Sequence, residues 1–146
     1  MAALERPDAR DEPCQVPQPQ GDGFVRVDVT WGEVQPIELA SGVHTIGELE
    51  LIEHLERGLP AIDTRLAEFH SQGSIPGARA IPHEEIEARR HELDPAVPTV
   101  FFCNGPQCTA TPDAIDRLLK AGYPAGSILY YRGGMHDWMT LGYPTS

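Results

Sequence analysis

The segment TVFFCNGPQCTATPDAIDRLLKAG, residues 99–122, contains the pattern that decides the fold. Residues 99–103 are a continuous apolar run, which is typical of a strand that is covered on both faces. Residues 104–107 are turn-forming, and residues 111–122 have the apolar stripe, the Thr-Pro-Asp start and the glycine end of a helix. The segment therefore predicts a strand–loop–helix unit in which Cys103 is the last residue of a buried strand.

Strand and helix patterns alternate on both sides of this unit. The predicted strands cover residues 60–64 and 127–131, the predicted helices cover residues 45–58 and 83–93, and a Gly-rich turn at 132–134 leads into a short final helix. Thr45 and Glu48 form a capping-box pattern at the start of the first helix. This alternation predicts an α/β fold, with a mostly parallel central sheet and helices on both of its faces.

The N-terminal part of the sequence differs from the rest. Prolines and a scarcity of apolar residues are typical of a flexible arm, whereas FVRVDVTW (24–31) alternates with period two, as a half-buried strand does. Residues 33–39 are expected to pair back with that strand as a hairpin, and Pro36 would place them at an edge. The expected organisation is an arm over residues 1–22, a hairpin extension over 23–44 and one domain over 45–146.

Charge and hydropathy argue against several classes of function. The formal net charge is −11, from 22 acidic residues and 11 lysines and arginines, so we expect no nucleic-acid partner. No apolar run approaches the roughly 20 residues that cross a bilayer, and the start of the chain lacks the apolar core of a signal peptide. The expectation is a cytoplasmic protein without a membrane partner, and the hairpin extension is a candidate surface for a homodimer.

The three cysteines raise the question of what thiols do here. An odd count without an export signal favours reduced thiols over a disulfide scaffold. Cys103 and Cys108 are the one pair with metal-ligand spacing, and the six histidines are scattered, so we expect no metal and no cofactor. Because ligands of parallel sheets bind at the carboxyl ends of strands, Cys103 is expected at the floor of a loop lined by backbone N–H groups. That environment would lower the pKa of the Cys103 thiol, although a buried cysteine can also serve for packing alone.

Two further stretches resemble the rhodanese-like domains. IDTRLAEFHSQGSIPGARAIP (62–82) is similar to the family pattern D-x-R-x-x-x-E-F-x-x-G-H-I-P-G-A, with Ser74 in place of the histidine. YYRGGMHDWMTLGYP (130–144) is similar to the closing pattern L-x-G-G-x-x-x-W-x-x-x-G-Y-P. Cys103 lies between them, where the family has its nucleophile. The resemblance covers roughly residues 45–146 and implies a rhodanese-like fold.

The resemblance implies a single-domain sulfurtransferase. The Cys103 thiolate would take sulfane sulfur from thiosulfate or a persulfide, hold it as a cysteine persulfide, and pass it to a thiol or to cyanide. The residues that would bind the substrate are those of the loop, Asn104, Gly105, Pro106, Gln107, Cys108 and Thr109. Asp63 and Arg65 would support the loop through charge pairing, with Glu68 as a further candidate partner. The neighbours His136 and Asp137 are not expected to face each other.

The loop departs from the family at one position. Many members have an arginine where this sequence has Cys108, so the loop carries no formal charge. This disfavours phosphatase activity and makes a persulfide donor more suitable than the thiosulfate dianion. Cys108 would resolve the persulfide as a disulfide, relay the sulfur or protect Cys103, or it would only pack beneath the loop. The alternative function is a redox-responsive or sulfur-delivery module that uses both thiols with a protein partner.

Overall fold

The computed structural model describes residues 16–19, 21–23, 25–26 and 33–146. Its centre is a five-stranded sheet with the strand order β3-β7-β6-β4-β5, in which all neighbours are parallel. The strands are β3 (His44–Ile46), β4 (Ala61–Asp63), β5 (Arg79–Ala80), β6 (Thr99–Phe102) and β7 (Ile128–Tyr131). The predicted α/β class and the parallel sheet are confirmed.

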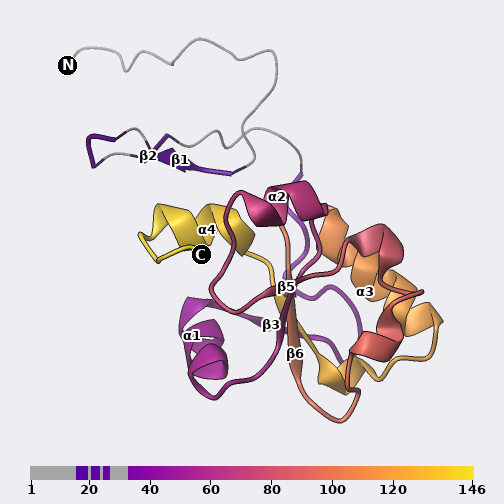
Figure 1. Ribbon diagram of the computed structural model, residues 1–146. Helices are drawn as coiled ribbons and strands as arrows, with labels where there is room; N and C mark the ends of the chain where they lie inside the picture. Colours follow the sequence, from indigo (N-terminus) through magenta and orange to yellow (C-terminus); the bar gives the residue numbers. More distant parts are fainter. Residues whose placement is uncertain (1–15, 20, 24, 27–32) are drawn as a thin grey trace.

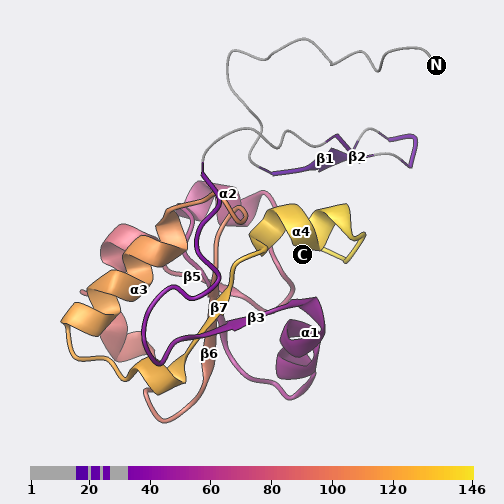
Figure 2. The same cartoon turned by 180° about the vertical axis from the view of Figure 1, so that it is seen from behind.

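Helices cover both faces of this sheet. They are α1 (Glu48–Glu56), α2 (Ala67–Ser71), α3 (Ala110–Lys120) and α4 (Gly134–Thr140), with short 3₁₀ turns η1 (His83–Glu85), η2 (Arg90–Glu92) and η3 (Ala125–Ser127). Figure 1 shows α1 and α4 on one side of the sheet and α3 on the other, and the reverse view in Figure 2 shows the same division. No helix in the described ranges is long and apolar enough to span a membrane.

The central strand β6 explains why the core has two halves. All four of its residues are buried, as its apolar sequence predicts. Because successive side chains of a strand point to opposite faces, Phe101 packs with Ile115 and Leu118 of α3, whereas Val100 and Phe102 pack with the α1 and α4 side. The predicted strands at 60–64, 99–103 and 127–131 are thus confirmed to within one residue at each end, with Cys103 following β6 directly.

Two of the predicted helices differ from the structure. Thr45 lies in β3 instead of capping α1, and its hydroxyl donates to the carbonyl of Ile37, so the capping box is wrong. The cause is the parallel ladder with β7, which residues 44–46 join. Residues 83–93 form η1 and η2 with turns between them, not one helix. Ile86 and Leu93 do pack against the core as predicted, but this stretch has too few apolar residues to hold a continuous helical face.

The N-terminal hairpin also differs from the prediction, because its two strands are not the expected ones. β1 (Gln18–Pro19) pairs antiparallel with β2 (Val25–Arg26), and residues 33–39 contain no strand. The Gln35 backbone instead donates to the carbonyl of Pro106 (2.6 Å) and accepts from Arg132 Nη1 (2.7 Å). The segment is therefore fastened to the cysteine loop, where its backbone groups find partners. Most of the predicted strand 24–31 and of the arm lies outside the described residues, and the boundaries of the three segments stay predictions.

Candidate functional site

The cysteine loop leads from the carboxyl end of β6 to α3, whose N-cap is Thr109. Its backbone is held by the start of α4, since Met135 N donates to the carbonyl of Cys103 (2.9 Å) and His136 N to that of Asn104 (2.7 Å). Within the loop, Cys108 N donates to the carbonyl of Gly105 (3.1 Å). Parallel strands β6 and β7 end at the same edge of the sheet, so the segments that follow them meet here.

Gly134 allows this close approach. Its φ is +58°, and a Cβ on it would lie 2.4 Å from the Cys103 carbonyl oxygen and 2.7 Å from Gly105 N. Any other residue would displace the backbone of the loop, because both contacts are with main-chain atoms. The Gly-rich turn predicted at 132–134 therefore packs against the loop through Gly134.

The loop contains two free thiols that lie together. Cys103 is 1% exposed, Cys108 is 9% exposed, and Cys103 Sγ donates to the backbone carbonyl of Cys108 (3.8 Å). Burial raises the pKa of Cys103 well above its usual range, and the contact with Cys108 adds to this. The hydrogen bond from Cys103 lowers the pKa of Cys108 to about 6, with help from the backbone N–H groups of Ala110 and Asn104. The predicted low-pKa thiol therefore belongs to Cys108, because charge on Cys103 would be buried completely.

A chain of hydroxyl groups runs beneath Cys103. Thr64 Oγ1 donates to the carbonyl of Phe102 (3.0 Å) and lies 2.9 Å from Thr111 Oγ1. Thr111 is fully buried and hydrogen-bonds Cys103 through both its side chain and its backbone, which favours the thiolate form of Cys103. Sequence reasoning placed Thr111 at the helix cap and missed this contact. The only signal in the sequence was the pair of threonines on either side of Ala110. It did not show whether a threonine caps the helix or contacts the Cys103 thiol.

Asp63 and Arg65 form the predicted charge pair at the side of the loop. Asp63 is fully buried and accepts from Arg65 through Nε (3.0 Å) and Nη2 (2.7 Å), from the Ser74 hydroxyl (2.9 Å) and from His70 Nδ1 (3.1 Å). Burial opposes the charge on Asp63, but the bonds and the charge of Arg65 lower its pKa overall. Arg65 also reaches the Asn104 side chain (3.4 Å). Ser74 and His70 take the place that was expected for Glu68, which is exposed.

A second cluster of titratable residues lies at the start of α3. His83 Nδ1 lies 2.6 Å from Asp113 Oδ2, and Arg117 Nε donates to the same oxygen (2.8 Å). Residues 83 and 113 are far apart in sequence, so no local pattern indicated this contact. His136 Nδ1 and Asp137 Oδ1 also lie 3.0 Å apart, which corrects the expectation that these neighbours do not meet.

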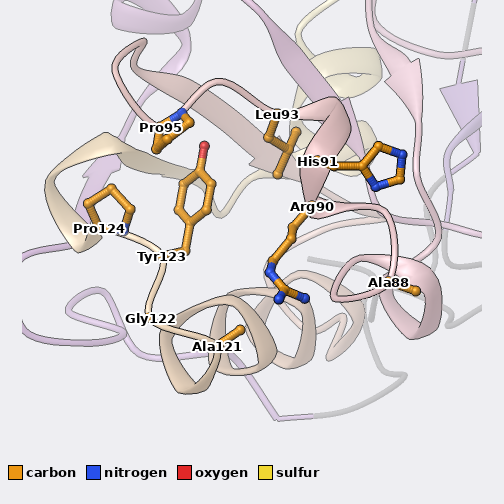
Figure 3. Close-up of a pocket in the computed structure, with 9 residues that line it drawn as sticks. All are labelled: Ala88, Arg90, His91, Leu93, Pro95, Ala121, Gly122, Tyr123 and Pro124. Atoms are coloured by element: carbon orange, nitrogen blue, oxygen red, sulfur yellow. The ribbon is translucent and has the colours of Figure 1, made fainter.

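A hollow of about 520 Å³ lies at the other end of the sheet. Figure 3 shows its lining, with the Tyr123 side chain directed toward Pro95. Tyr123 and Pro124 precede β7, and Pro95 precedes β6, so the hollow is at the amino ends of the strands whereas Cys103 is at the carboxyl end. None of its lining residues is a thiol, and the Tyr123 hydroxyl is itself buried without a partner. The free thiols of the described residues therefore lie away from this hollow.

The described ranges hold no group of three or more His, Cys, Asp or Glu side chains that could bind a metal ion. The polar groups around the loop are instead committed to one another. Cys103, Cys108 and Asn104, all predicted as site residues, do lie together, and Asp63 and Arg65 join them through Asn104. The arrangement places two thiols at the start of α3, with the backbone N–H groups of Asn104 and Ala110 next to Cys108.

Comparisons with known proteins identify the family of this chain. Residues 48–141 match the Rhodanese-like domain family. An HTH-type transcriptional regulator of Mycobacterium tuberculosis, Rv0324, is 33% identical over 107 residues, which are 73% of this chain and 46% of the regulator. The chain thus spans about half the length of that relative.

Solved structures share the fold. A rhodanese-related protein of Thermoplasma volcanium has a TM-score of 0.57 at 19% identity, covering 70% of this chain and 97% of that one. The Alr3790 protein of Anabaena sp. has a TM-score of 0.60 at 25% identity, covering 69% and 90%. The fold is rhodanese-like, and the matched domain is of the general sulfurtransferase type. The chain belongs to the rhodanese-like domain family.

Proposed function

We propose that this chain is a sulfurtransferase that carries sulfane sulfur as a persulfide on Cys103. The observation that carries the proposal is the pair of buried free thiols in the loop between β6 and α3, with Cys103 Sγ in contact with the Cys108 carbonyl. A persulfide anion is large and delocalised, and several N–H and O–H donors suit it better than one opposite charge does. Thr111 supplies two such donors to Cys103.

The reaction has two steps. The Cys103 thiolate attacks the sulfane sulfur of the donor, a new S–S bond forms on Cys103, and the old bond breaks with its electron pair on the leaving group. That group is sulfite when the donor is thiosulfate, and a thiolate when the donor is a persulfide. A thiol or cyanide then attacks the outer sulfur and leaves Cys103 as a thiolate.

The charges around the loop support a persulfide as the better donor. Loop residues 104–109 have no charged side chain other than the Cys108 thiolate. Arg65 is committed to Asp63 and to the carbonyl of Gly73 (2.8 Å), and Arg132 donates to the carbonyl of Gln35. A thiosulfate dianion would therefore meet no available guanidinium from these two residues, whereas a protonated persulfide needs none.

Intact-protein mass spectrometry tests the proposal. Fully reduced protein is treated with glutathione persulfide or thiosulfate, and cyanide is then added while thiocyanate is followed. We expect the mass of one sulfur atom to be gained with persulfide, more slowly with thiosulfate, and to be lost to cyanide. Cys103→Ser should gain none, while Cys108→Ser should still load. Absence of loading in the wild type with both donors would refute the proposal.

A second candidate function follows from the same thiol pair. The Cys108 thiolate can attack the inner sulfur of the Cys103 persulfide, so that a Cys103–Cys108 disulfide forms and HS⁻ leaves. In this role the chain would be a redox-responsive module, and a protein partner would bind or reduce the disulfide form. A relative named as a transcriptional regulator is consistent with such a role. Under this candidate the loaded wild type releases sulfide once and stalls with both thiols blocked to alkylation, whereas an enzyme continues to turn over with cyanide.

A further inference from the structure

Residues 33–36 form a short strap that lies against the cysteine loop. The Gln35 N–H donates to the carbonyl of Pro106 (2.6 Å), and the Gln35 carbonyl accepts from Arg132 Nη1 (2.7 Å). One residue of the strap therefore joins a loop residue to a guanidinium. Because both bonds are made by the main chain of Gln35, they do not depend on its side chain.

The side chains of the strap contribute little to its attachment. Val34 is 59% exposed, and Pro36 is exposed as well. Among the described residues, the hydrogen bonds between the strap and the domain are those of Gln35. The chain is anchored from Ile37 onward, where the Ile37 carbonyl accepts from the Thr45 hydroxyl of β3. The strap can therefore detach from the loop while the anchored part stays in place.

Arg132 approaches the loop from the turn that follows β7. Gly134 of the same turn packs directly against the backbone of Cys103. The Arg132 side chain is half-buried, and its charge meets a neutral carbonyl, which is a weaker partner than an anion. Arg65, in contrast, is paired with the fully buried carboxylate of Asp63. Of these two arginines, Arg132 is the one that an incoming anion can recruit.

We propose that Arg132 selects the sulfur donor, and that the strap withholds it from anions until Gln35 leaves Pro106. With the strap attached, the guanidinium is occupied and the loop favours a persulfide donor. With the strap released, the guanidinium can bind the oxygen atoms of thiosulfate beside the loop. Because the strap and the anion compete for one group, each weakens the binding of the other by the same factor. The choice of donor rests on the proposed sulfurtransferase function, whereas the competition for Arg132 does not.

Calorimetric titration with thiosulfate tests this competition. It is done in a Cys103→Ser background, so that no sulfur is transferred. Gln35→Pro removes the N–H donor and places a ring carbon against the Pro106 carbonyl, so the strap must move away. We expect thiosulfate to bind about tenfold more tightly, which is the gain for a strap that is open about one tenth of the time. Gln35→Ala is the matched control, because it keeps both main-chain bonds, and it should leave the affinity unchanged.

Arg132→Gln identifies the group that the anion binds. Added to Gln35→Pro, it should abolish the gain in affinity, because the amide carries no charge. Arg57→Gln is the control, since Arg57 is exposed and follows α1 before β4, at the other end of the sheet. A gain that survives Arg132→Gln, or no gain in Gln35→Pro, would overturn the proposal. Circular dichroism checks that each variant is folded.

Hydrogen exchange of the strap gives a readout that does not depend on a change of sequence in the strap. In the full chain with Cys103→Ser, thiosulfate should accelerate exchange several-fold in peptides that contain the Gln35 amide, because the anion takes Arg132 from the strap. Sodium chloride at the same ionic strength should have no such effect. Exchange that is unchanged or slowed by thiosulfate would show that the strap stays in place, and the proposal would be wrong.

Sulfur loading separates this inference from the proposed function. In protein that keeps Cys103, Gln35→Pro should raise the loading rate at low thiosulfate about tenfold. Loading from glutathione persulfide should be nearly unchanged, since its carboxylates are several bonds away from the sulfane sulfur. An equal gain with both donors would show that the strap hinders access in general, and donor selection by Arg132 would be refuted. A wild type that loads with neither donor refutes the proposed function, while calorimetry and exchange still decide the competition for Arg132.

Discussion

Asp63 and Asp113 are bound by the same kinds of partner in two very different surroundings. Each carboxylate accepts from an arginine and lies next to the Nδ1 of a histidine, His70 or His83. The Asp63 side chain is 0% exposed, whereas that of Asp113 is 37% exposed. A buried ion pair holds its geometry because every lost bond leaves an unsolvated charge, and a solvated pair can exchange protons with water. The difference makes the first cluster a rigid support of the loop and leaves the second cluster in contact with water.

Asp63→Ala should produce the largest effect. It leaves the Arg65 guanidinium buried without its carboxylate, which costs about 3–5 kcal/mol in the free energy of unfolding. Asp113→Ala should cost about 1 kcal/mol or less, because water screens that cluster. Urea unfolding at pH 7 measures both. Equal losses would show that burial does not distinguish the two clusters.

The acid dependence of stability should separate the clusters in the same way. The pKa of Asp63 is lower in the folded protein than the value of about 3.9 in an unfolded chain. Its contribution to stability is therefore fully present above about pH 4, and it is lost as the pH falls through the folded pKa. In Asp63→Asn, the decrease in unfolding free energy below pH 4 should be much shallower than in the wild type. Asp113→Asn should retain most of that decrease, and the reverse order would contradict the assignment.

The cysteine loop lies between the two clusters. Gly134→Ala tests whether the backbone of this loop depends on the close approach of Gly134. The added Cβ meets main-chain atoms of Cys103 and Gly105, and the φ of +58° adds strain. We expect a loss of about 2–3 kcal/mol, together with slower sulfur loading. Gly142→Ala is the matched control, since its φ is +82° but the space around its Cβ is open. A loss no larger than that of the control would show that the loop can move away.

Ser74→Ala should have a smaller effect than Asp63→Ala or Gly134→Ala. It removes one donor from a buried carboxylate that keeps its arginine, which costs about 1–2 kcal/mol. Ser71→Ala, at an exposed serine that donates to the carbonyl of Glu68, is the control and should leave the urea midpoint nearly unchanged. If both variants behave alike, Asp63 does not depend on the serine that stands in place of the family histidine.

Patterns local in sequence predicted the parts of the fold that depend on burial. The apolar run of β6, the turn after it and the stripe of α3 were recognisable, because a covered strand and an amphipathic helix each impose a short repeat. The pairing of Asp63 with Arg65 was also accessible, since the two residues are neighbours within a family motif. The helix over 83–93 and the partner of the hairpin were wrong, because hydrogen bonds with distant segments outweighed weak local preferences.

The sequence by itself thus determined a rhodanese-like α/β domain with Cys103 at the end of its central strand. Only the tertiary structure decided which thiol has the lower pKa, since the burial of Cys103 and Cys108 depends on how α4 and α3 close around the loop. It also decided that His83 meets Asp113, thirty residues further along the chain. The physical reason is that apolar repeats are read over a few residues, whereas desolvation and charge pairing depend on every segment that folds against the site.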